Sequence, residues 1–296
     1  MVQLDSLKRE MADYANACGF GDAPQPTRVP RLSLVRSRIS TEFTAIDYQP
    51  IFCLVLQGSK QTRIGERLHR FGALQSFIVS LDLPATACVV EATPQTPYLA
   101  LALDLDIDLL RDLASGLKDP GAMDSRTPEA ALVMGDADPA LIDAMARLFA
   151  LREDPMDIDV LAPLVIREIH YRLLLGDQGS ALRALVQPDG HASRIARAIA
   201  RIRRDYAAPL TVAALAREAG MSVSAFHDHF RALTGTTPLQ YQKALRLMEA
   251  RRRLQAAAGS VTSIAYEVGY ESPTQFSREY RRQFGQSPRS DRRLPA

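Results

Sequence analysis

The chain has 296 residues, a formal net charge of +2 at pH 7 and three cysteines, Cys18, Cys53 and Cys88. This length allows two or three compact units, and no apolar run approaches the ~18 residues that a membrane span requires. The chain starts without a charged and then apolar leader, and its scattered cysteines suit neither a disulfide framework nor a metal knuckle. We therefore expect a cytoplasmic protein with reduced thiols, no membrane contact and no cofactor.

Residues 28–104 consist of short β-prone runs separated by Gly, Pro and polar turns. Turns spaced about every 8–12 residues are typical of a small barrel or sandwich. Cys53 and Cys88 lie in two of the apolar runs, where core packing is the plain interpretation. A sharper hypothesis is that an oxidant or electrophile modifies one of these two thiols and so signals to the rest of the protein.

Residues 106–186 show apolar residues at steps of three and four, which predicts three helices. The segments are "DIDLLRDLASGL", "PALIDAMARLFALRE" and "VLAPLVIREIHYRLLLG". Helices this apolar must pack on the strands, on each other or on a second chain. The third is the best candidate for a homodimer contact, and packing within the chain stays an open alternative. The stretch "LVQPDGHAS" (185–193) combines Pro, Gly and Ser and predicts a linker.

Two copies of one helical unit follow the linker. Before an internal glycine, Val212, Ala216, Glu218 and Gly220 match Val261, Ala265, Glu267 and Gly269 at an offset of 49. After it, Ser222, Phe226, Phe230, Gly235 and Pro238 match Ser272, Phe276, Tyr280, Gly285 and Pro288 at an offset of 50. One such unit could be an ordinary amphipathic hairpin, but matching caps, glycines and aromatics in two copies predict a pair of helix-turn-helix modules.

The second helix of the second unit has a strong start signal. Ser272 can cap the helix, Pro273 suits its first position, and Gln275 completes a Ser-x-x-Gln capping box. Residues 238–259, between the units, predict a helical rod of about 30 Å. One turn of B-DNA is about 34 Å, so such a rod can place two reading helices in successive major grooves.

Basic charge is concentrated in the same region. Residues 191–296 contain 18 Lys/Arg and 8 Asp/Glu, a balance of +10, whereas the remainder has a balance of −8. A charge run is usually only a solvated face. Here charge and motif coincide, which indicates a domain that binds a polyanion.

The side chains expected to face DNA lie opposite the aromatic face of each reading helix. They are Val223, Ser224, His227, Asp228 and Arg231 on the first helix, and Thr274, Gln275, Ser277, Arg278, Arg281 and Arg282 on the second. Gln can pair with adenine and Arg with guanine, each contact being worth about 1–3 kcal/mol of discrimination. Arg281 and Arg282, further along the helix, are expected to hold phosphate.

Residues 194–293 resemble the DNA-binding domain of the AraC/XylS family of bacterial transcription regulators. The resemblance is carried by "LAREAGMSVSAFHDHF", "ALRLMEARRRL" and "IAYEVGYESPTQFSREYRRQFGQSP". Two residues depart from the family pattern: Asp228 stands where a basic residue is common, and Asp291 where an aromatic is common. These departures imply weaker DNA binding by the first module and a loosely anchored final turn.

Residues 25–185 are similar to the N-terminal domain of one AraC-type subgroup, through "LVLQGSK", "SLDLPATACVVEATPQTPYLALAL" and "REIHYRLLLGDQGSAL". The resemblance implies a cupin-like barrel that senses a small molecule. Cupin oxygenases need clustered histidines around a metal, and this region offers only His69. A DNA-repair alkyltransferase would need four clustered cysteines. Neither enzyme fits, so we expect no catalysis and no metal.

These observations predict an α+β protein with three parts. Residues 1–105 would form a cupin-like sensing β-barrel, residues 106–190 a helical relay or dimerisation segment with the linker, and residues 191–296 an all-α domain of two helix-turn-helix modules joined by a long helix. The expected function is sequence-specific regulation of transcription at promoter DNA, with a small-molecule effector, a homodimer and RNA polymerase as candidate partners. The alternative is an architectural protein that binds DNA with little sequence preference.

Overall fold

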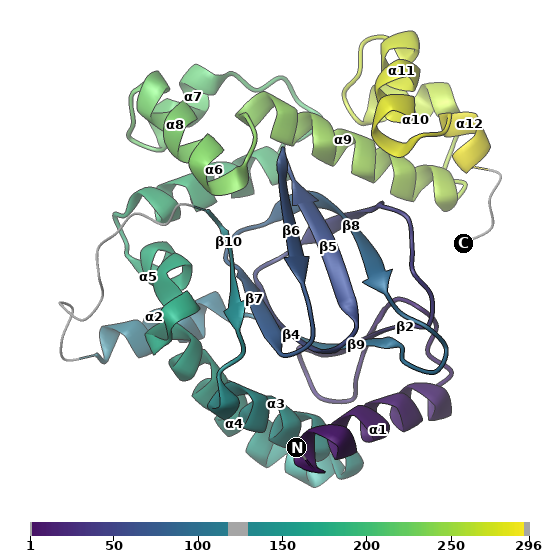
Figure 1. The fold of residues 1–296 in the computed structure, drawn as a ribbon. Coiled ribbons are helices and arrows are strands. Elements are labelled where there is room, and N and C mark those ends of the chain that lie inside the picture. The colour runs from purple at the N-terminus through teal and green to yellow at the C-terminus, as the bar shows by residue number, and fades with distance from the viewer. Residues whose placement is uncertain (1, 118–129, 293–296) are drawn as a thin grey trace.

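The computed structural model describes residues 2–117 and 130–292. Strands fill most of the first half of the chain, and the described part after residue 138 is helical (Figure 1). The predicted α+β class is therefore confirmed. None of the helices in the described ranges is long and apolar enough to cross a membrane.

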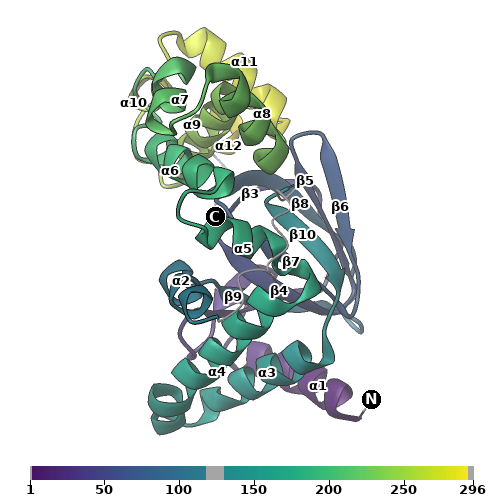
Figure 2. The same ribbon diagram turned by 90° about the vertical axis from the view of Figure 1, so that its left-hand side faces the viewer.

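The strands form two antiparallel sheets that lie against each other (Figure 2). The larger sheet has the order β1 (Pro24–Pro26), β2 (Leu32–Ser37), β9 (Tyr98–Asp104), β4 (Ile51–Gln57), β7 (Gln75–Val79) and β10 (Leu132–Asp136). The smaller has the order β3 (Thr44–Tyr48), β8 (Leu83–Glu91), β5 (Ser59–Ile64) and β6 (Arg67–Phe71).

The described strands do not close into the barrel that we predicted, because each sheet ends in its own edge strands. The outermost strand of the larger sheet, β1, contains Pro24 and Pro26. Proline has no backbone N–H to donate to a further strand, so pairing stops at this edge. The β-rich prediction was correct, whereas the closure of the barrel was not.

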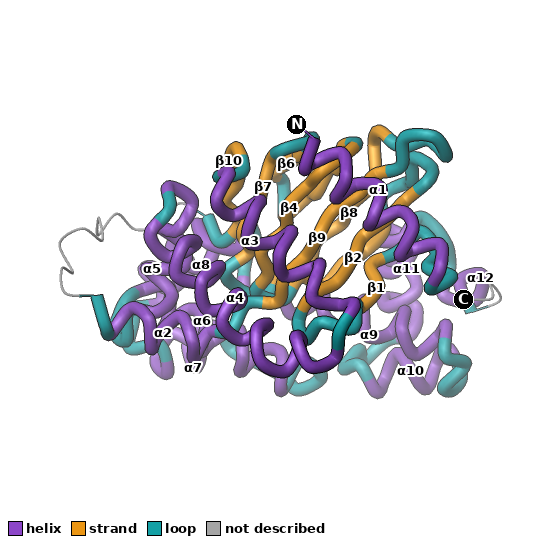
Figure 3. Tube along the Cα trace, turned by 90° about the horizontal axis from the view of Figure 1, so that it is seen from below, coloured by secondary structure: helices purple, strands orange, loops and turns teal. Residues whose placement is uncertain are grey.

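The larger sheet is buried on both faces. Along β4, Cys53 and Val55 face the smaller sheet, whereas Phe52 and Leu54 face the other side. Three helices cover that second face: α1 (Val2–Ala17), α3 (Pro139–Ala150) and α4 (Pro155–Leu175) (Figure 3). This burial explains why the strand sequence is apolar at successive positions and does not alternate.

Three elements depart from the sequence-based expectation. Helix α1 was not predicted, although Leu7, Met11 and Ala15 lie one turn apart and are buried. Strand β10 was also missed, because it is short and lies at an edge, where only its partner β7 specifies it. The predicted linker 185–193 is reduced to residues 187–190, since α5 (Ser180–Val186) and α6 (His191–Arg204) occupy the rest. The predicted helix at 106–117 is present as α2 (Ile107–Ser115).

The C-terminal helices form the two predicted units. Module 1 contains α6, α7 (Val212–Glu218) and α8 (Val223–Thr234), and module 2 contains α10 (Val261–Glu267), α11 (Pro273–Phe284) and α12 (Pro288–Asp291). Helix α9 (Pro238–Gln255) joins them (Figure 1). The apolar core of module 1 is continuous with the core between the two sheets, whereas module 2 has a core of its own.

Candidate nucleic-acid interface

The two reading helices, α8 and α11, are built by the same local devices. Ser222 and Ser272 cap their N-termini, each hydroxyl accepting a hydrogen bond from a backbone N–H at 3.3 Å. Gly235 and Gly285 end them in the left-handed conformation, with φ of 68° and 75°. A residue with a side chain would be strained there, which explains why both copies carry glycine.

One face of each reading helix is locked into its module by aromatic rings. Phe226 and Phe230 on α8, and Phe276 and Tyr280 on α11, have no exposed surface. The ring of Phe230 meets the ring of Tyr241 on α9 edge to face at a centroid distance of 5.6 Å. Packing of this kind fixes the rotation of each helix about its axis, and so decides which residues face outward.

Most of the residues that we expected to face DNA are exposed. Those with exposed positions are Val223, Ser224, Asp228, Arg231, Thr274, Gln275, Arg278, Arg281 and Arg282. His227 and Ser277 are partly buried, and the Ser277 hydroxyl donates to the Pro273 carbonyl of its own helix at 2.8 Å. The structure therefore brings most of the set onto two outward helix faces, and the base and phosphate contacts stay predictions.

The capping box predicted at Gln275 is only half formed. Its backbone N–H donates to Ser272, but its side-chain amide donates to Glu279 at 3.3 Å. The full box occurs at the start of α9, between Thr237 and Gln240. The Gln275 side chain is thus engaged along the helix surface, from which it can turn toward a base without uncapping α11.

Asp291 anchors the final helix, contrary to the loose turn that we predicted. Its carboxylate is buried, accepts a hydrogen bond from the Tyr280 hydroxyl at 2.6 Å and pairs with Arg251 at 2.9 Å. The Arg251 guanidinium also lies over the Phe284 ring, 4.8 Å from its centroid. An acidic residue fits in place of the expected aromatic here because Arg251 from α9 and Tyr280 from α11 both donate to it.

The relative orientation of the modules is held by α9 residues that the sequence did not single out. Arg246 donates to the backbone carbonyls of Tyr206 (2.7 Å), Ala208 (3.1 Å) and Ala207 (3.3 Å) in the α6–α7 loop, and to that of Gly269 (2.8 Å) in the turn of module 2. One guanidinium therefore ties both modules to the joining helix. An arginine on a helix ordinarily indicates a solvated face, so sequence alone gave no signal for this role.

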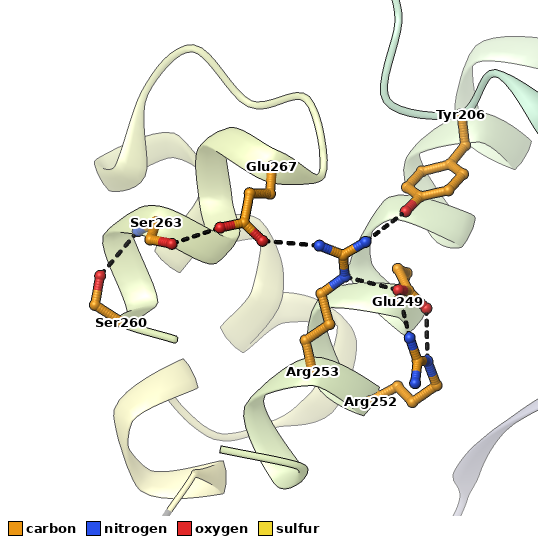
Figure 4. A network of polar contacts seen from close by, with 7 residues as sticks. All are labelled: Tyr206, Glu249, Arg252, Arg253, Ser260, Ser263 and Glu267. Carbon is orange, nitrogen blue, oxygen red and sulfur yellow. Dashed lines mark hydrogen bonds and ion pairs between the residues drawn. The ribbon is translucent and has the colours of Figure 1, made fainter. Parts of the chain in front are cut away.

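A second set of contacts lies further along α9 (Figure 4). Arg253 donates to Glu267 on α10 at 2.8 Å, to Glu249 at 2.7 Å and to the Tyr206 hydroxyl at 3.2 Å. The Ser263 hydroxyl donates to Glu267 at 2.6 Å. Because these groups are partly exposed, each pair by itself contributes little to stability. Together the contacts join α9 to α10 and to the α6–α7 loop.

Module 1 is attached to the sheets through polar contacts as well as through the shared core. Arg203 on α6 donates two hydrogen bonds to the Asp47 carboxylate, at 2.9 and 2.5 Å. The Tyr241 hydroxyl donates to the Asp82 carbonyl at 2.7 Å, and the Ala131 N–H donates to the Leu233 carbonyl at 2.9 Å. The first reading helix is therefore positioned by the N-terminal half of the chain.

The two cysteines proposed as sensors are buried. Cys53 faces the core between the sheets, and burial raises the pKa of its thiol to about 12. Cys88 is also buried, and burial raises the pKa of its thiol as well. A raised pKa disfavours the reactive thiolate at neutral pH. Thiol sensing at either residue stays an untested prediction.

Metal binding finds no support in the described ranges. Over residues 2–117 and 130–292, no three His, Cys, Asp or Glu side chains gather in a way that could hold a metal ion. His69 lies on β6, where burial lowers the pKa of its imidazole.

Comparison with known proteins gives two family matches. Residues 28–181 match the family described as AraC-type transcriptional regulator N-terminus, and residues 215–294 match a helix-turn-helix domain family. These matches confirm the resemblance derived from the sequence motifs.

Curated relatives include the HTH-type transcriptional activator RhaS of Pectobacterium atrosepticum, 35% identical over 89 residues, which are 30% of this chain and 32% of the relative. RhaS of Escherichia coli O1:K1 is 32% identical over 154 residues, which are 52% of this chain and 55% of the relative. The chain thus spans only part of the length of these relatives. The crystal structure of unsaturated fatty acid bound ToxT from Vibrio cholerae has a TM-score of 0.58 at 9% identity, over 88% of this chain and 94% of ToxT. At that identity the likeness concerns the fold alone.

Proposed function

The chain belongs to the AraC-type transcriptional regulators, and we propose that it binds double-stranded DNA at promoter sites and regulates transcription in response to a small molecule. The observation that carries the proposal is the pair of reading helices, whose aromatic faces are buried and whose outward faces expose Ser224, Arg231, Thr274, Gln275, Arg278, Arg281 and Arg282. Helix α9 has 18 residues, which gives a span of about 27 Å between the modules. That span is compatible with successive major grooves on one side of the duplex.

We propose that the parts of the chain divide this work. Residues 1–105 would sense the signal, residues 106–190 would relay it, and residues 191–296 would bind DNA in the cytoplasm, where RNA polymerase is the second expected partner. A small-molecule signal is supported by the ToxT structure, which shares the fold and holds an unsaturated fatty acid. The shared core between the sheets and module 1 supports a mechanical relay, because a shift of one displaces the other.

Arg278→Ala tests the base-reading role of module 2. Arg278 is exposed on α11, and we expect its loss to relax the preference at one or two base pairs by about 1–3 kcal/mol. Selection of bound sequences from a randomised DNA pool, carried out in parallel for both proteins, measures the change.

Arg281→Ala is the matched control for that experiment. Because Arg281 is expected to contact phosphate, its loss should weaken binding to all DNA sequences about equally. It should also lower the slope of log affinity against log salt by about one. If both variants bind every sequence with wild-type affinity, α11 does not read DNA.

We also propose that the protein forms a homodimer through α4. The outward face of this helix carries an apolar stripe, with Met156 71%, Val160 60% and Leu164 63% exposed, and it continues to Tyr171 and Leu175. Asp157 and Asp159 lie toward one end of the helix, and Arg167 and Arg172 lie toward the other. Antiparallel pairing of two copies about Leu164 would bury both stripes and place each acidic end beside a basic end.

Leu164→Glu tests this contact. The side chain is mostly exposed in one chain, so we expect the fold to change by no more than about 0.5 kcal/mol while the dimer dissociates. Sedimentation velocity over a range of protein concentrations measures the association, and Ile39→Glu, at another exposed apolar residue, is the control. A wild-type protein that stays monomeric, or a Leu164→Glu protein that still dimerises, contradicts the proposal.

A further inference from the structure

One largely buried carboxylate of module 2 touches a side chain that we expect to read DNA. Glu279 on α11 accepts a hydrogen bond at 3.3 Å from the side-chain amide of Gln275, which lies one helical turn before it. We propose that Glu279 is a positioning residue, which orients the Gln275 carboxamide so that it recognises adenine at one base pair. The inference rests on the proposed function and names a residue that determines its sequence specificity.

Glu279 is itself held from two further directions. Its side chain is only 13% exposed, and its carboxylate accepts from Lys243 on α9 at 2.9 Å and from the Tyr270 hydroxyl at 2.8 Å. Burial acts to raise the pKa of this carboxyl, but the donors Lys243, Tyr270 and Gln275 outweigh burial and lower the pKa from its usual value. Glu279 is therefore ionised at neutral pH, and an ionised carboxylate accepts hydrogen bonds but cannot donate one.

The acceptor-only character of Glu279 decides which way the Gln275 amide faces. Because a carboxylate can receive only the NH₂ group, the carbonyl oxygen of Gln275 points away from it, and the second N–H stays available. In the major groove adenine presents a donor at N6 and an acceptor at N7, which match that carbonyl oxygen and that N–H. Gln275 can thus keep its bond to Glu279 while it binds adenine, and it loses less conformational freedom on binding.

Module 1 supplies an internal comparison. At the offset of 50 residues, His229 takes the place of Glu279, and Ala225 takes the place of Gln275. His229 also faces the supporting helix of its module, since its ring stacks on that of His191 on α6 at a centroid distance of 4.0 Å. Ala225 has no polar side-chain group to orient, so the Gln275–Glu279 bond has no counterpart in module 1.

An ion pair that only fastens α11 to α9 would use the same contact between Glu279 and Lys243. That role concerns the whole helix, so its loss should weaken binding to every DNA sequence alike. A positioning role acts through Gln275 alone, and its loss should change the preference at the single base pair that Gln275 contacts. The two roles therefore differ in a measurable quantity.

Selection of bound sequences from a randomised pool of DNA duplexes by the full-length protein tests the proposal. The base pair read by Gln275 is the one at which Gln275→Ala loses the preference for adenine. At that pair Glu279→Ala should reduce the preference by about fivefold or more and leave the preferences at other pairs unchanged.

Two further variants are the controls. Glu279→Gln keeps an acceptor oxygen toward Gln275, and its NH₂ group can donate to the Tyr270 hydroxyl oxygen, so it should retain most of the preference. Glu271→Ala removes an exposed carboxylate from the same module and should select the same sequences as the wild type.

A double-mutant cycle shows whether Glu279 acts through Gln275. In the Gln275→Ala protein, the further change Glu279→Ala should leave the preference at this base pair as it is, because no carboxamide remains to be oriented. Relative affinities for duplexes that carry adenine or guanine at that position, and are otherwise identical, measure each corner of the cycle.

Three results would overturn the inference: Gln275→Ala leaves every base preference unchanged, Glu279→Ala keeps the wild-type preference at the pair, or Glu279→Ala weakens all sequences equally whether or not Gln275 is present. Any of these results, with selection by the wild-type protein intact, removes this inference alone. A wild-type protein that enriches no sequence from the pool contradicts the proposed function itself, and this inference with it.

Discussion

Asp291→Ala is expected to lower the free energy of unfolding of module 2 by about 1–3 kcal/mol, because it removes a buried acceptor that Arg251 and Tyr280 share. The Asp291 side chain is 1% exposed and pairs with Arg251, which is itself 24% exposed. The same substitution removes the acceptor of the Tyr280 hydroxyl, whose ring belongs to the core of module 2. Chemical denaturation followed by tyrosine fluorescence and circular dichroism measures the loss.

Two further variants separate the causes. Asp291→Asn keeps an acceptor for Tyr280 but removes the charge, so it should fall between the wild type and Asp291→Ala. Glu271→Ala changes an exposed carboxylate in the same module and should stay within about 0.5 kcal/mol of the wild type. A wild-type unfolding curve for Asp291→Ala would mean that the ion pair with Arg251 does not form.

Arg246→Met should uncouple the two modules. The substitution keeps much of the side-chain volume but removes donors to four carbonyls, at Tyr206, Ala207, Ala208 and Gly269. Hydrogen bonds from charged groups contribute about 1.5–3 kcal/mol each, and neighbouring ones do not add fully, so we expect a loss of about 2–4 kcal/mol in stability. The larger consequence concerns DNA, since the distance between the reading helices is no longer fixed.

Affinities for DNA with one and with two half-sites measure that consequence. The wild-type protein should bind DNA with two half-sites much more tightly than DNA with one. Arg246→Met should lose most of this increase in affinity, while its affinity for a single half-site changes little. Arg252→Met is the matched control, because Arg252 is 70% exposed and pairs with Glu249 within the same helix. An undiminished gain in Arg246→Met would show that α9 alone sets the spacing.

The local structure of the reading helices could be predicted from the sequence. Ser272, Pro273 and Gly285 mark the start and end of α11, and the four-residue spacing of Phe276, Tyr280 and Phe284 identifies its inward face. These signals are local, since a cap or a left-handed glycine acts within one helical turn. Because the helical unit occurs twice, the signals in each copy support the same interpretation of the other copy.

Contacts between distant segments could not be predicted in this way. Arg246, Asp291 and Arg203 each have a partner far away in the chain, and nothing in their sequence neighbourhood identifies that partner. The prediction of a closed barrel was wrong for a similar reason. Strand-forming segments were recognisable, but whether the outer strands pair with each other depends on the whole arrangement of the sheets, including the prolines of β1.

The measurement that tests the central claim most directly is a hydroxyl-radical footprint of the full-length protein on its promoter DNA at low ionic strength. Two reading helices on one rigid chain predict two protected segments on one face of the duplex, about one helical turn or 10–10.5 base pairs apart. Continuous protection without phase, or no protection at any protein concentration, would contradict the claim.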